Sequence, residues 1–359
     1  MLTEGSILRQ VRAHAPTIGL ALVFLALLLG TCEILARTET GQRIFGPTSL
    51  GTSHEQFEVT LSKLNSFIAR HGHLQCLVLG SSVVHAAVDP DVLAAAYRKR
   101  VGSALNCFNA GIEGIAASTS GLLAEILAHR YHPTLLIYGV TAHDVSDRGG
   151  WKGARAIERS PWVQYQTGVV TISGWLSEHS YAYRDYTTYR NWMTTSYWDD
   201  LKARWTRESK TSLAGYAATH RASQLAQSLA DAKHKVRAQA IPPDWAIPRA
   251  AFEGLERISR LTQEGTTVLM VEVPVSQFAV GFFRDGKRDY ERTIDPVARY
   301  AAAHAIPFWR TMPLDLFGDD GWDDIGHMNA RGAQAFSQWL GNQVGLAVAR
   351  HELSERPRT

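Results

Sequence analysis

The sequence predicts an α/β protein whose parallel sheet is covered on both faces by helices. Three observations lead to this prediction. Short apolar runs alternate with segments of helical length and spacing, several runs end at a glycine, and a long uncharged segment stands near the N-terminus. Strands that alternate with helices form parallel sheets, and ligands then bind beyond the carboxyl ends of the strands.

The overall composition is that of a globular protein. The 359 residues are 45% hydrophobic and 20% charged, which is enough for one large domain, or two smaller ones, with a sizeable core. The formal net charge of +3 argues against a nucleic-acid binder that depends on a basic surface. We therefore expect no nucleic-acid partner.

The N-terminal segment has the length and composition of a membrane-spanning helix. No charged residue lies between Ala15 and Cys32, and the segment from Thr17 to Ala36 is about long enough to cross a bilayer core. Glu33 falls near its end, where lipid headgroups could solvate it. A retained anchor and a cleaved signal peptide are the alternatives. The residues before Cys32 and Ala36 fit cleavage sites poorly, which favours the anchor.

The orientation of this anchor depends on weaker signals. Arg9 and Arg12 before the span are offset by Arg37 and Arg43 after it, so the positive-inside count discriminates little. The short amino-terminal tail favours a cytoplasmic N-terminus. We therefore expect residues 1–40 to form a cytoplasmic tail and a single-pass anchor in the cell (inner) membrane. The rest of the chain would then be extracytoplasmic, in the periplasm.

The elements expected up to residue 144 alternate between helix and strand. Each strand is a short apolar run that ends near a glycine (Gly80, Gly111 or Gly139), as in a buried parallel strand. Pro90 suits the first turn of a helix, and Asp89 can cap that helix. In chain order we expect a helix ending before residue 74, strand 76–79, helix 90–97, strand 104–109, helix 118–129 and strand 134–138.

The alternation resumes only in the last third of the chain. The expected elements there are helix 249–262, strand 267–273, a fifth strand at 306–309 and helix 330–348. The α/β domain is therefore predicted to comprise residues 41–144 and 249–351, followed by a polar tail at 352–359.

Residues 145–248 break this pattern and are far longer than a normal crossover. We expect a helical insertion or cap over the site, with an amphipathic helix at 213–236. Its tryptophans either fill a small core of the insertion, bind sugar rings, or lie at the membrane interface. They are Trp151, Trp162, Trp175, Trp192, Trp198, Trp205 and Trp245.

The three cysteines give no metal-binding pattern. Cys76 and Cys107 each lie in a short apolar run, where a small buried hydrophobe is the favoured interpretation and a disulfide between them is the alternative. No C-x-x-C pair is present, so we expect no zinc site and no other cofactor.

Two short motifs suggest nucleophilic catalysis. Ser82, in Gly80-Ser81-Ser82, directly follows a predicted strand, where a tight turn can expose a nucleophilic hydroxyl. Asp324 and His327 share a loop near the C-terminus, and a serine needs such a histidine to take its proton and a carboxylate to orient that histidine. The plainer alternatives are a helix cap at Ser82 and one incidental histidine among 14.

An oxyanion hole would complete such a site. Gly111 ends the second strand, so its N–H could face the serine. His143, which follows the third strand and precedes Asp144, could supply a side-chain donor. The plainer alternative for Gly111 is an ordinary turn between strand and loop. For His143 and Asp144 it is a pair of loop residues whose hydrogen bonds are local, with Asp144 bonding the backbone. Since the carboxyl ends of parallel strands share one edge, these groups are expected to converge there.

Taken in this order, the motifs resemble the SGNH (GDSL-like) hydrolase superfamily. Ser82 stands in the nucleophile position of the first block, with Ser81 in place of the usual aspartate. Residues 109–111 (Asn-Ala-Gly) resemble the second block, and residues 324–327 match the D-x-x-H of the fifth. In the third block, within residues 139–144, the family asparagine is replaced. His143 is the best substitute, and Thr141 is the other alignment.

The resemblance implies a three-layer, flavodoxin-like sheet and a serine esterase or O-acyltransferase. An anchored, interrupted SGNH domain is similar to alginate O-acetylation proteins and to the D-alanyl transfer protein of teichoic acid synthesis. The implied substrates are an acyl ester or acyl donor and an extracytoplasmic polysaccharide or related glycan, with other envelope polysaccharide proteins as further partners. The altered third block and the tryptophan-rich insertion leave a different class open: a non-catalytic scaffold in an envelope polysaccharide modification or export complex.

Overall fold

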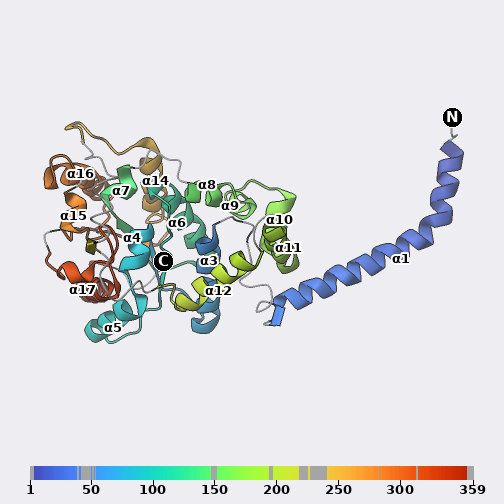
Figure 1. Cartoon of the computed structure of the whole chain (residues 1–359), viewed down its shortest axis with the longest axis horizontal. Coiled ribbons are helices and arrows are strands. Elements are labelled where there is room, and N and C mark those ends of the chain that lie inside the picture. The colour runs from blue at the N-terminus through green and yellow to red at the C-terminus, as the bar shows by residue number, and fades with distance from the viewer. Residues whose placement is uncertain are drawn as a thin grey trace.

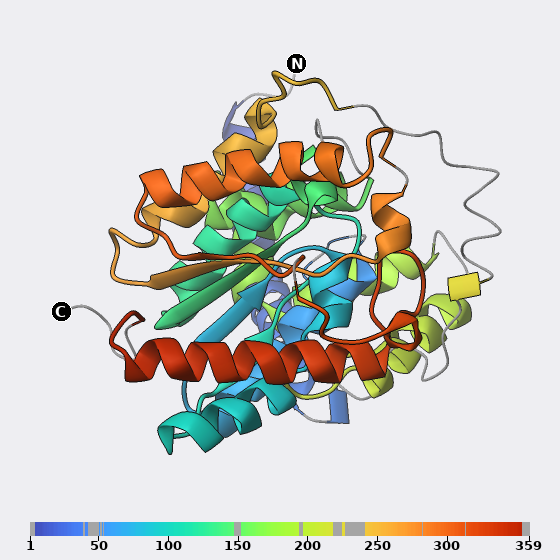
Figure 2. The ribbon, with the colours of Figure 1, turned by 90° about the vertical axis from the view of Figure 1, so that its left-hand side faces the viewer.

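The computed structural model describes residues 4–38, 40–41, 50, 52, 54–146, 152–193, 197–217, 225–226, 241–281, 283–312 and 314–353. Within these residues, five parallel strands form one sheet in the order β2-β1-β3-β4-β5 (Figure 2). The strands are β1 Cys76–Leu79, β2 Cys107–Asn109, β3 Leu135–Val140, β4 Thr267–Glu272 and β5 Phe308–Trp309. The predicted α/β class and parallel sheet are confirmed, and this strand order also occurs in flavodoxin-like sheets.

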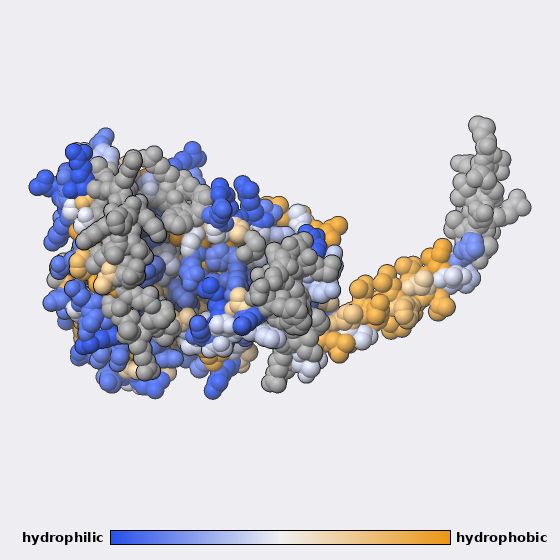
Figure 3. Space-filling view, in the orientation of Figure 1, coloured by the Kyte–Doolittle hydropathy of each residue, from blue (hydrophilic) through white to orange (hydrophobic). Residues whose placement is uncertain are grey.

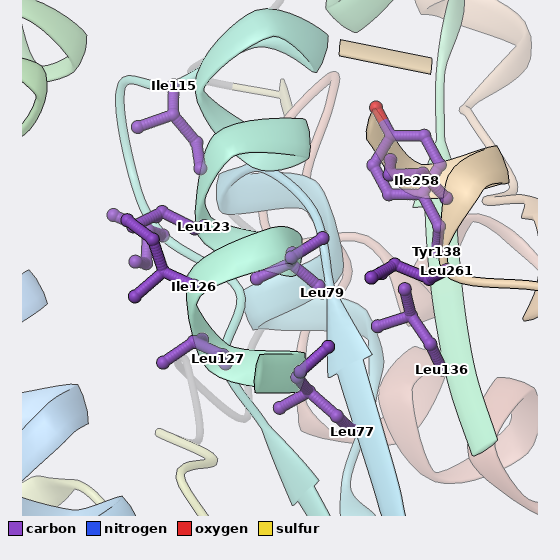
Figure 4. Close-up of a cluster of buried hydrophobic side chains, with 14 of the residues drawn as sticks. Leu77, Leu79, Ile115, Leu123, Ile126, Leu127, Leu136, Tyr138, Ile258 and Leu261 are labelled. Carbon is purple, nitrogen blue, oxygen red and sulfur yellow. The ribbon is translucent and has the colours of Figure 1, made fainter. Parts of the chain in front are cut away.

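Side chains of alternate strand residues pack into two separate cores, one on each face of the sheet. Leu77 of β1 and Leu136 of β3 point into the larger core, whereas Cys76 and Val78 belong to the other. Burial on both faces explains why the strands are apolar throughout. Figure 4 shows part of the larger core, with side chains from β1, β3, α6 and α14.

Helices cover both faces of the sheet and make three layers (Figure 2). One face carries α3 Glu55–His71, α6 Ala117–Tyr131, α14 Arg249–Arg260 and α16 Lys287–Ala303, and the other carries α5 Pro90–Val101 and α17 Ala330–Ala349. Glycines allow the closest helix contacts: a Cβ at Gly121 of α6 would clash with the backbone of Gly254 in α14. The predicted helix after Asp89 is confirmed, and the Asp89 carboxylate accepts the N–H of Asp91 at 3.0 Å.

Three expectations about local structure were wrong or incomplete. Residues 211–217 do not begin the predicted helix at 213–236, because Ala214 pairs with the end of β2 by accepting the Asn109 N–H at 2.9 Å. Most of the remainder of that predicted helix lies outside the described residues. Helix α16 was not predicted, since its sequence is polar and contains Pro296.

The third concerns Cys76 and Cys107, which form a disulfide although two separate thiols were favoured. The strand register places the two residues directly opposite each other on β1 and β2. The sequence could not show this, because it does not reveal which strands are neighbours.

The N-terminal helix α1 (Glu4–Arg37) extends away from the rest of the protein (Figure 1). Residues 14–37 are long and apolar enough to cross a membrane (Figure 3). The side chains of residues 14–32 are exposed, whereas Ala36, where the helix meets the rest of the protein, is buried. A single-pass anchor and a signal sequence both fit this helix.

The described part of the insertion contains five helices, which lie at the end of the domain nearer to α1 (Figure 1). They are α8 Lys152–Glu158, α9 Pro161–Gln166, α10 Ile172–His179, α11 Tyr181–Met193 and α12 Tyr197–Lys210. Trp162 is 2% exposed and packs near Phe57, so this tryptophan fills a core, whereas Trp175 and Trp205 are 50% and 43% exposed. Trp151 and the side chains of Trp192 and Trp198 lie outside the described parts.

Candidate active site

Ser82 is the first residue of a short helix, α4 (Ser82–Ala87), that starts immediately after β1. The turn between strand and helix depends on Gly80, where an added Cβ would lie 2.7 Å from the Gly139 carbonyl oxygen. The first N–H groups of a helix have no acceptor within that helix. The Ser82 hydroxyl and the Ser82 N–H are therefore presented together at the carboxyl edge of the sheet.

The loop before α17 brings His327 and Asp324 to this serine. His327 Nε2 lies 2.9 Å from Ser82 Oγ, and His327 Nδ1 lies 2.9 Å from Asp324 Oδ2. The two protein segments are 245 residues apart in the chain. The three residues proposed from the sequence as a triad thus form one continuous chain of hydrogen bonds.

Hydrogen bonds within the loop fix the direction in which His327 points. Asp324 Oδ1 accepts the N–H groups of Gly326 and His327, both at 2.7 Å. Asn329 Oδ1 accepts the N–H groups of Arg331 and Gly332 at the start of α17, and Asn329 Nδ2 donates to the Asp320 carbonyl oxygen at 2.6 Å. The loop is therefore held at both ends, and the imidazole needs little ordering before it can act.

The electrostatics of the pair favour a charged carboxylate and a basic imidazole. Partial burial opposes both charged forms, but the mutual hydrogen bond and charge attraction outweigh it. As a result the pKa of Asp324 lies below its ordinary value, and the pKa of His327 lies above 6.5. Such a histidine is a stronger base toward the serine hydroxyl.

The structure does not bring Gly111 to the serine as the sequence suggested. Its N–H donates to Asn109 Oδ1 at 2.8 Å, and it does not line the pocket around Ser82. A Cβ on Gly111 would lie 2.8 Å from the His85 Cα, so this glycine allows the strand end to approach α4. The close packing of the loop against α4 therefore explains why a glycine stands at position 111.

Gly114, three residues further along the same loop, does line the pocket. It has a φ of +68°, and its N–H has no acceptor among the hydrogen bonds of the described residues. Gly114 and Ser82 are therefore the better pair of backbone donors. The sequence shows two glycines in this loop, and only the path of the chain reveals which one lines the pocket.

Both candidates for the altered third block line the pocket, but Thr141 is buried whereas His143 is exposed. The Thr141 hydroxyl donates to Asp144 Oδ2 at 2.9 Å, so its proton is already used in a hydrogen bond and does not point to an oxyanion. Asp144 is fully buried, and this burial raises its pKa, although the hydrogen bonds from the Thr141 N–H and hydroxyl oppose the rise. His143 is exposed at the pocket wall, on α7 (Ala142–Ser146). His143 therefore remains the side-chain candidate.

The pocket beside Ser82 has a volume of about 430 Å³ and an apolar interior. Of the described part of the insertion (residues 145–248), only Ser146 lines the pocket, so the described side chains of α8–α12 do not reach the site. Residues 147–151, 194–196, 218–224 and 227–240 lie outside the described parts. Within the described residues, no group of three or more His, Cys, Asp or Glu side chains could hold a metal ion.

Comparison with known proteins found no match: no family model matches this chain, and no curated protein matches it. The assignment of a function therefore depends on the geometry of the site.

Proposed function

We propose that this chain is a serine-dependent esterase or O-acyltransferase of the SGNH type. The observation that carries the proposal is the 2.9 Å separation of His327 Nε2 and Ser82 Oγ, with Asp324 behind the imidazole. A hydroxyl, a base and an orienting carboxylate in this arrangement, at the mouth of an apolar pocket, suit acyl transfer.

The reaction would proceed in two halves. His327 takes the Ser82 proton as Oγ attacks the carbonyl carbon of an ester, and the resulting oxyanion accepts the N–H groups of Ser82 and Gly114, with His143 as a further donor. His327 then gives its proton to the leaving alkoxide, which departs as an alcohol. In the second half, His327 deprotonates water or an acceptor hydroxyl, which attacks the acyl-serine and releases Ser82.

The proposed compartment is the periplasm, with α1 as a membrane anchor. Disulfides persist in oxidising compartments and are rare in the cytosol. The Cys76–Cys107 disulfide in the buried sheet therefore supports an extracytoplasmic α/β domain. The proposed acceptor is an extracytoplasmic polysaccharide or related glycan, as the resemblance to SGNH proteins implies.

Labelling with a fluorophosphonate tests the catalytic proposal directly. The unchanged chain should be labelled, and Ser82→Ala and His327→Gln should lose the label. Ser146→Ala is the matched control, because Ser146 lines the same pocket and, among the described residues, its hydroxyl donates to the His143 carbonyl oxygen. Undiminished labelling of Ser82→Ala would refute the assignment. For the labelled enzyme, partition of the acyl group between water and an oligosaccharide then separates esterase from transferase.

One observation favours the alternative of a non-catalytic scaffold. The Thr141 hydroxyl is bound to Asp144, so the third block supplies no hydroxyl proton to the site. A scaffold predicts that Ser82→Ala leaves glycan modification or export intact in cells. Loss of that phenotype in Ser82→Ala favours the enzyme.

A further inference from the structure

The first inference concerns the acyl group and rests on the proposed function. Polar residues supply part of the lining of the pocket beside Ser82, among them Ser82, Thr141, His143, Ser146 and His327. The rest of its wall is built from apolar side chains on four different segments. They are Val83, Ile115, Val275, Ala279, Phe283 and Ile325.

The pocket is too large and too apolar for a two-carbon acyl group. An apolar cavity of about 150 Å³ binds benzene, and the volume here is about 430 Å³. An acetyl group is smaller than benzene, so it would leave most of the wall in contact with water, which is unfavourable.

The lining also opposes a charged acyl group. A D-alanyl group carries an ammonium, and a buried ammonium needs a carboxylate partner. No aspartate or glutamate is among the described residues that line the pocket. An uncharged chain makes better use of the whole wall.

We propose that the pocket binds an uncharged, medium-length acyl chain of about six carbons or more while its carbonyl carbon lies at Ser82. This differs from the acetyl and D-alanyl groups of the proteins that the motifs resemble. Each methylene that the pocket buries should raise the affinity for the acyl chain about fourfold.

The test is the hydrolysis of p-nitrophenyl esters from acetate to decanoate by the detergent-solubilised full chain. We expect kcat/KM for hexanoate to exceed that for acetate by on the order of a hundredfold. Hydrolysis that depends on Ser82 but is fastest with acetate overturns the pocket proposal and leaves the proposed function standing. Esterase activity that Ser82→Ala retains in full refutes the proposed function, and the pocket proposal with it.

A pair of variants tests the pocket wall itself. Ala279→Phe should fill part of the cavity, lower kcat/KM for hexanoate by about tenfold or more and spare acetate. Ala302→Phe, on the exposed side of α16, is the matched control. Phe283→Ala should instead move the preference toward decanoate. An equal loss on acetate and hexanoate in Ala279→Phe, with no change of preference in Phe283→Ala, contradicts the proposal.

A second inference arises from a different surface, at the start of α10. Val170 and Ile172 are 79% and 82% exposed, and Val169 and Trp175 are 51% and 50% exposed. Single exposed apolar residues are ordinary, but four within seven positions form a patch that calls for a partner.

The other end of α10 is bound to the anchor helix. Arg37 Nη2 donates to the His179 carbonyl oxygen at 3.1 Å, and Glu33 accepts the Ser180 hydroxyl at 2.8 Å. In Figure 1, α10 lies at the end of the domain from which α1 departs, and Figure 3 shows hydrophobic residues at that end. The patch and the attachment of an apolar helix that is able to cross a bilayer thus lie at the two ends of α10, on the side of the domain from which α1 departs.

The geometry points to the bilayer itself as the partner of residues 169–175. Aliphatic side chains with a tryptophan suit the interfacial layer, where an aromatic ring has apolar lipid on one side and water on the other. Together with α1, this second contact would hold the domain in a fixed orientation on the membrane. This inference depends on α1 spanning the membrane, and it is independent of the Ser82 chemistry.

An environment-sensitive fluorophore on a single cysteine can test this contact. Val170→Cys, in a Cys32→Ser background, is labelled and reconstituted as the full chain in phosphatidylethanolamine–phosphatidylglycerol vesicles. We expect a blue shift of the emission and quenching by doxyl-labelled lipid. Leu314→Cys, at an exposed leucine of another loop, should show neither effect.

The outcomes separate the bilayer from other partners. Quenching of Val170→Cys by aqueous iodide to the same extent as Leu314→Cys overturns the proposal. Protection from both iodide and doxyl-lipid also overturns it, since the patch would then be covered by a second copy of the chain.

Discussion

Asp324 and Glu33 are carboxylates that accept hydrogen bonds in the same way at two distant places. Asp324 accepts hydrogen bonds from the backbone N–H groups of Gly326 and His327 and from the imidazole of His327. Glu33 accepts the first two N–H groups of α11 and the Ser180 hydroxyl. Both sites use backbone amides to hold a charge, so the local bonding alone does not reveal their roles.

The two carboxylates differ in the groups that lie beyond them. Beyond Asp324, the imidazole presents its second nitrogen to the Ser82 hydroxyl at 2.9 Å, beside an apolar pocket. Beyond Glu33 lie the start of a helix, Arg37, which itself bonds the chain before that helix, and the nearby carboxylate of Asp185. A chain of hydrogen bonds that ends on a nucleophile can do chemistry, whereas one that ends on backbone can only hold two segments together.

The largest expected effect is on the catalytic side of this comparison. Asp324→Asn should lower kcat about 10⁴-fold, because the amide would favour the wrong histidine tautomer. Thermal stability should change little, since an asparagine side chain still accepts the N–H groups of Gly326 and His327. Ester hydrolysis and a melting curve on the same sample measure both. A variant with unaltered kcat would mean that Asp324 has the same structural role as Glu33.

The next largest effects are expected for alanine substitutions at Gly111 and Gly114, two glycines of one loop with different roles. Gly111→Ala should destabilise the fold by about 1–3 kcal/mol, because its methyl group would collide with the backbone of α4. Gly114→Ala has only Gly153 Cα near its added Cβ, at 3.9 Å, so it should cost about 1–2 kcal/mol through its positive φ.

The kinetic readout distinguishes a packing role from an oxyanion role. Gly114→Ala should lower kcat more than its loss of stability explains, because a shifted N–H no longer meets the oxyanion. Gly111→Ala, assayed well below its melting temperature, should keep its kcat. Chemical denaturation and steady-state kinetics at one temperature give both quantities. The reverse pattern would restore Gly111 as the oxyanion donor.

A smaller effect is expected at the anchor. Glu33→Ala should weaken the start of α11 by about 1 kcal/mol, as for the loss of a helix cap. Hydrogen exchange in nanodiscs should become faster at the Tyr181 and Ala182 amides, while kcat is unchanged. Glu291→Ala, which removes an exposed pair within α16, is the control and should leave these amides unaffected. Unaltered exchange in Glu33→Ala would show that the contact does not hold α11.

The two regions also differ in how far the sequence predicted them. The strand–glycine–serine turn and the Asp324–His327 loop are local patterns, so both could be recognised before their meeting at one sheet edge was known. The contact of Glu33 with Ser180 joins residues 147 apart, without any motif. The same holds for the disulfide between Cys76 and Cys107, which depends on which strands are neighbours. Gly111 was expected to supply an oxyanion N–H, but its N–H donates to Asn109 Oδ1, because spacing alone does not show which way a loop turns.

The smallest expected effect is a displacement of the pH profile, and it tests the electrostatic side of the comparison. His327 must be neutral to accept the Ser82 proton, so activity is lost as pH falls through its pKa. Although burial lowers that pKa, the hydrogen bond and the charge of Asp324 raise it above 6.5. The acid limb of kcat/KM should therefore have its midpoint above 6.5. In Asp324→Asn the attraction is removed while the burial remains, so the midpoint of the residual activity should move to lower pH. A midpoint that is the same in both proteins would show that Asp324 does not stabilise the imidazolium.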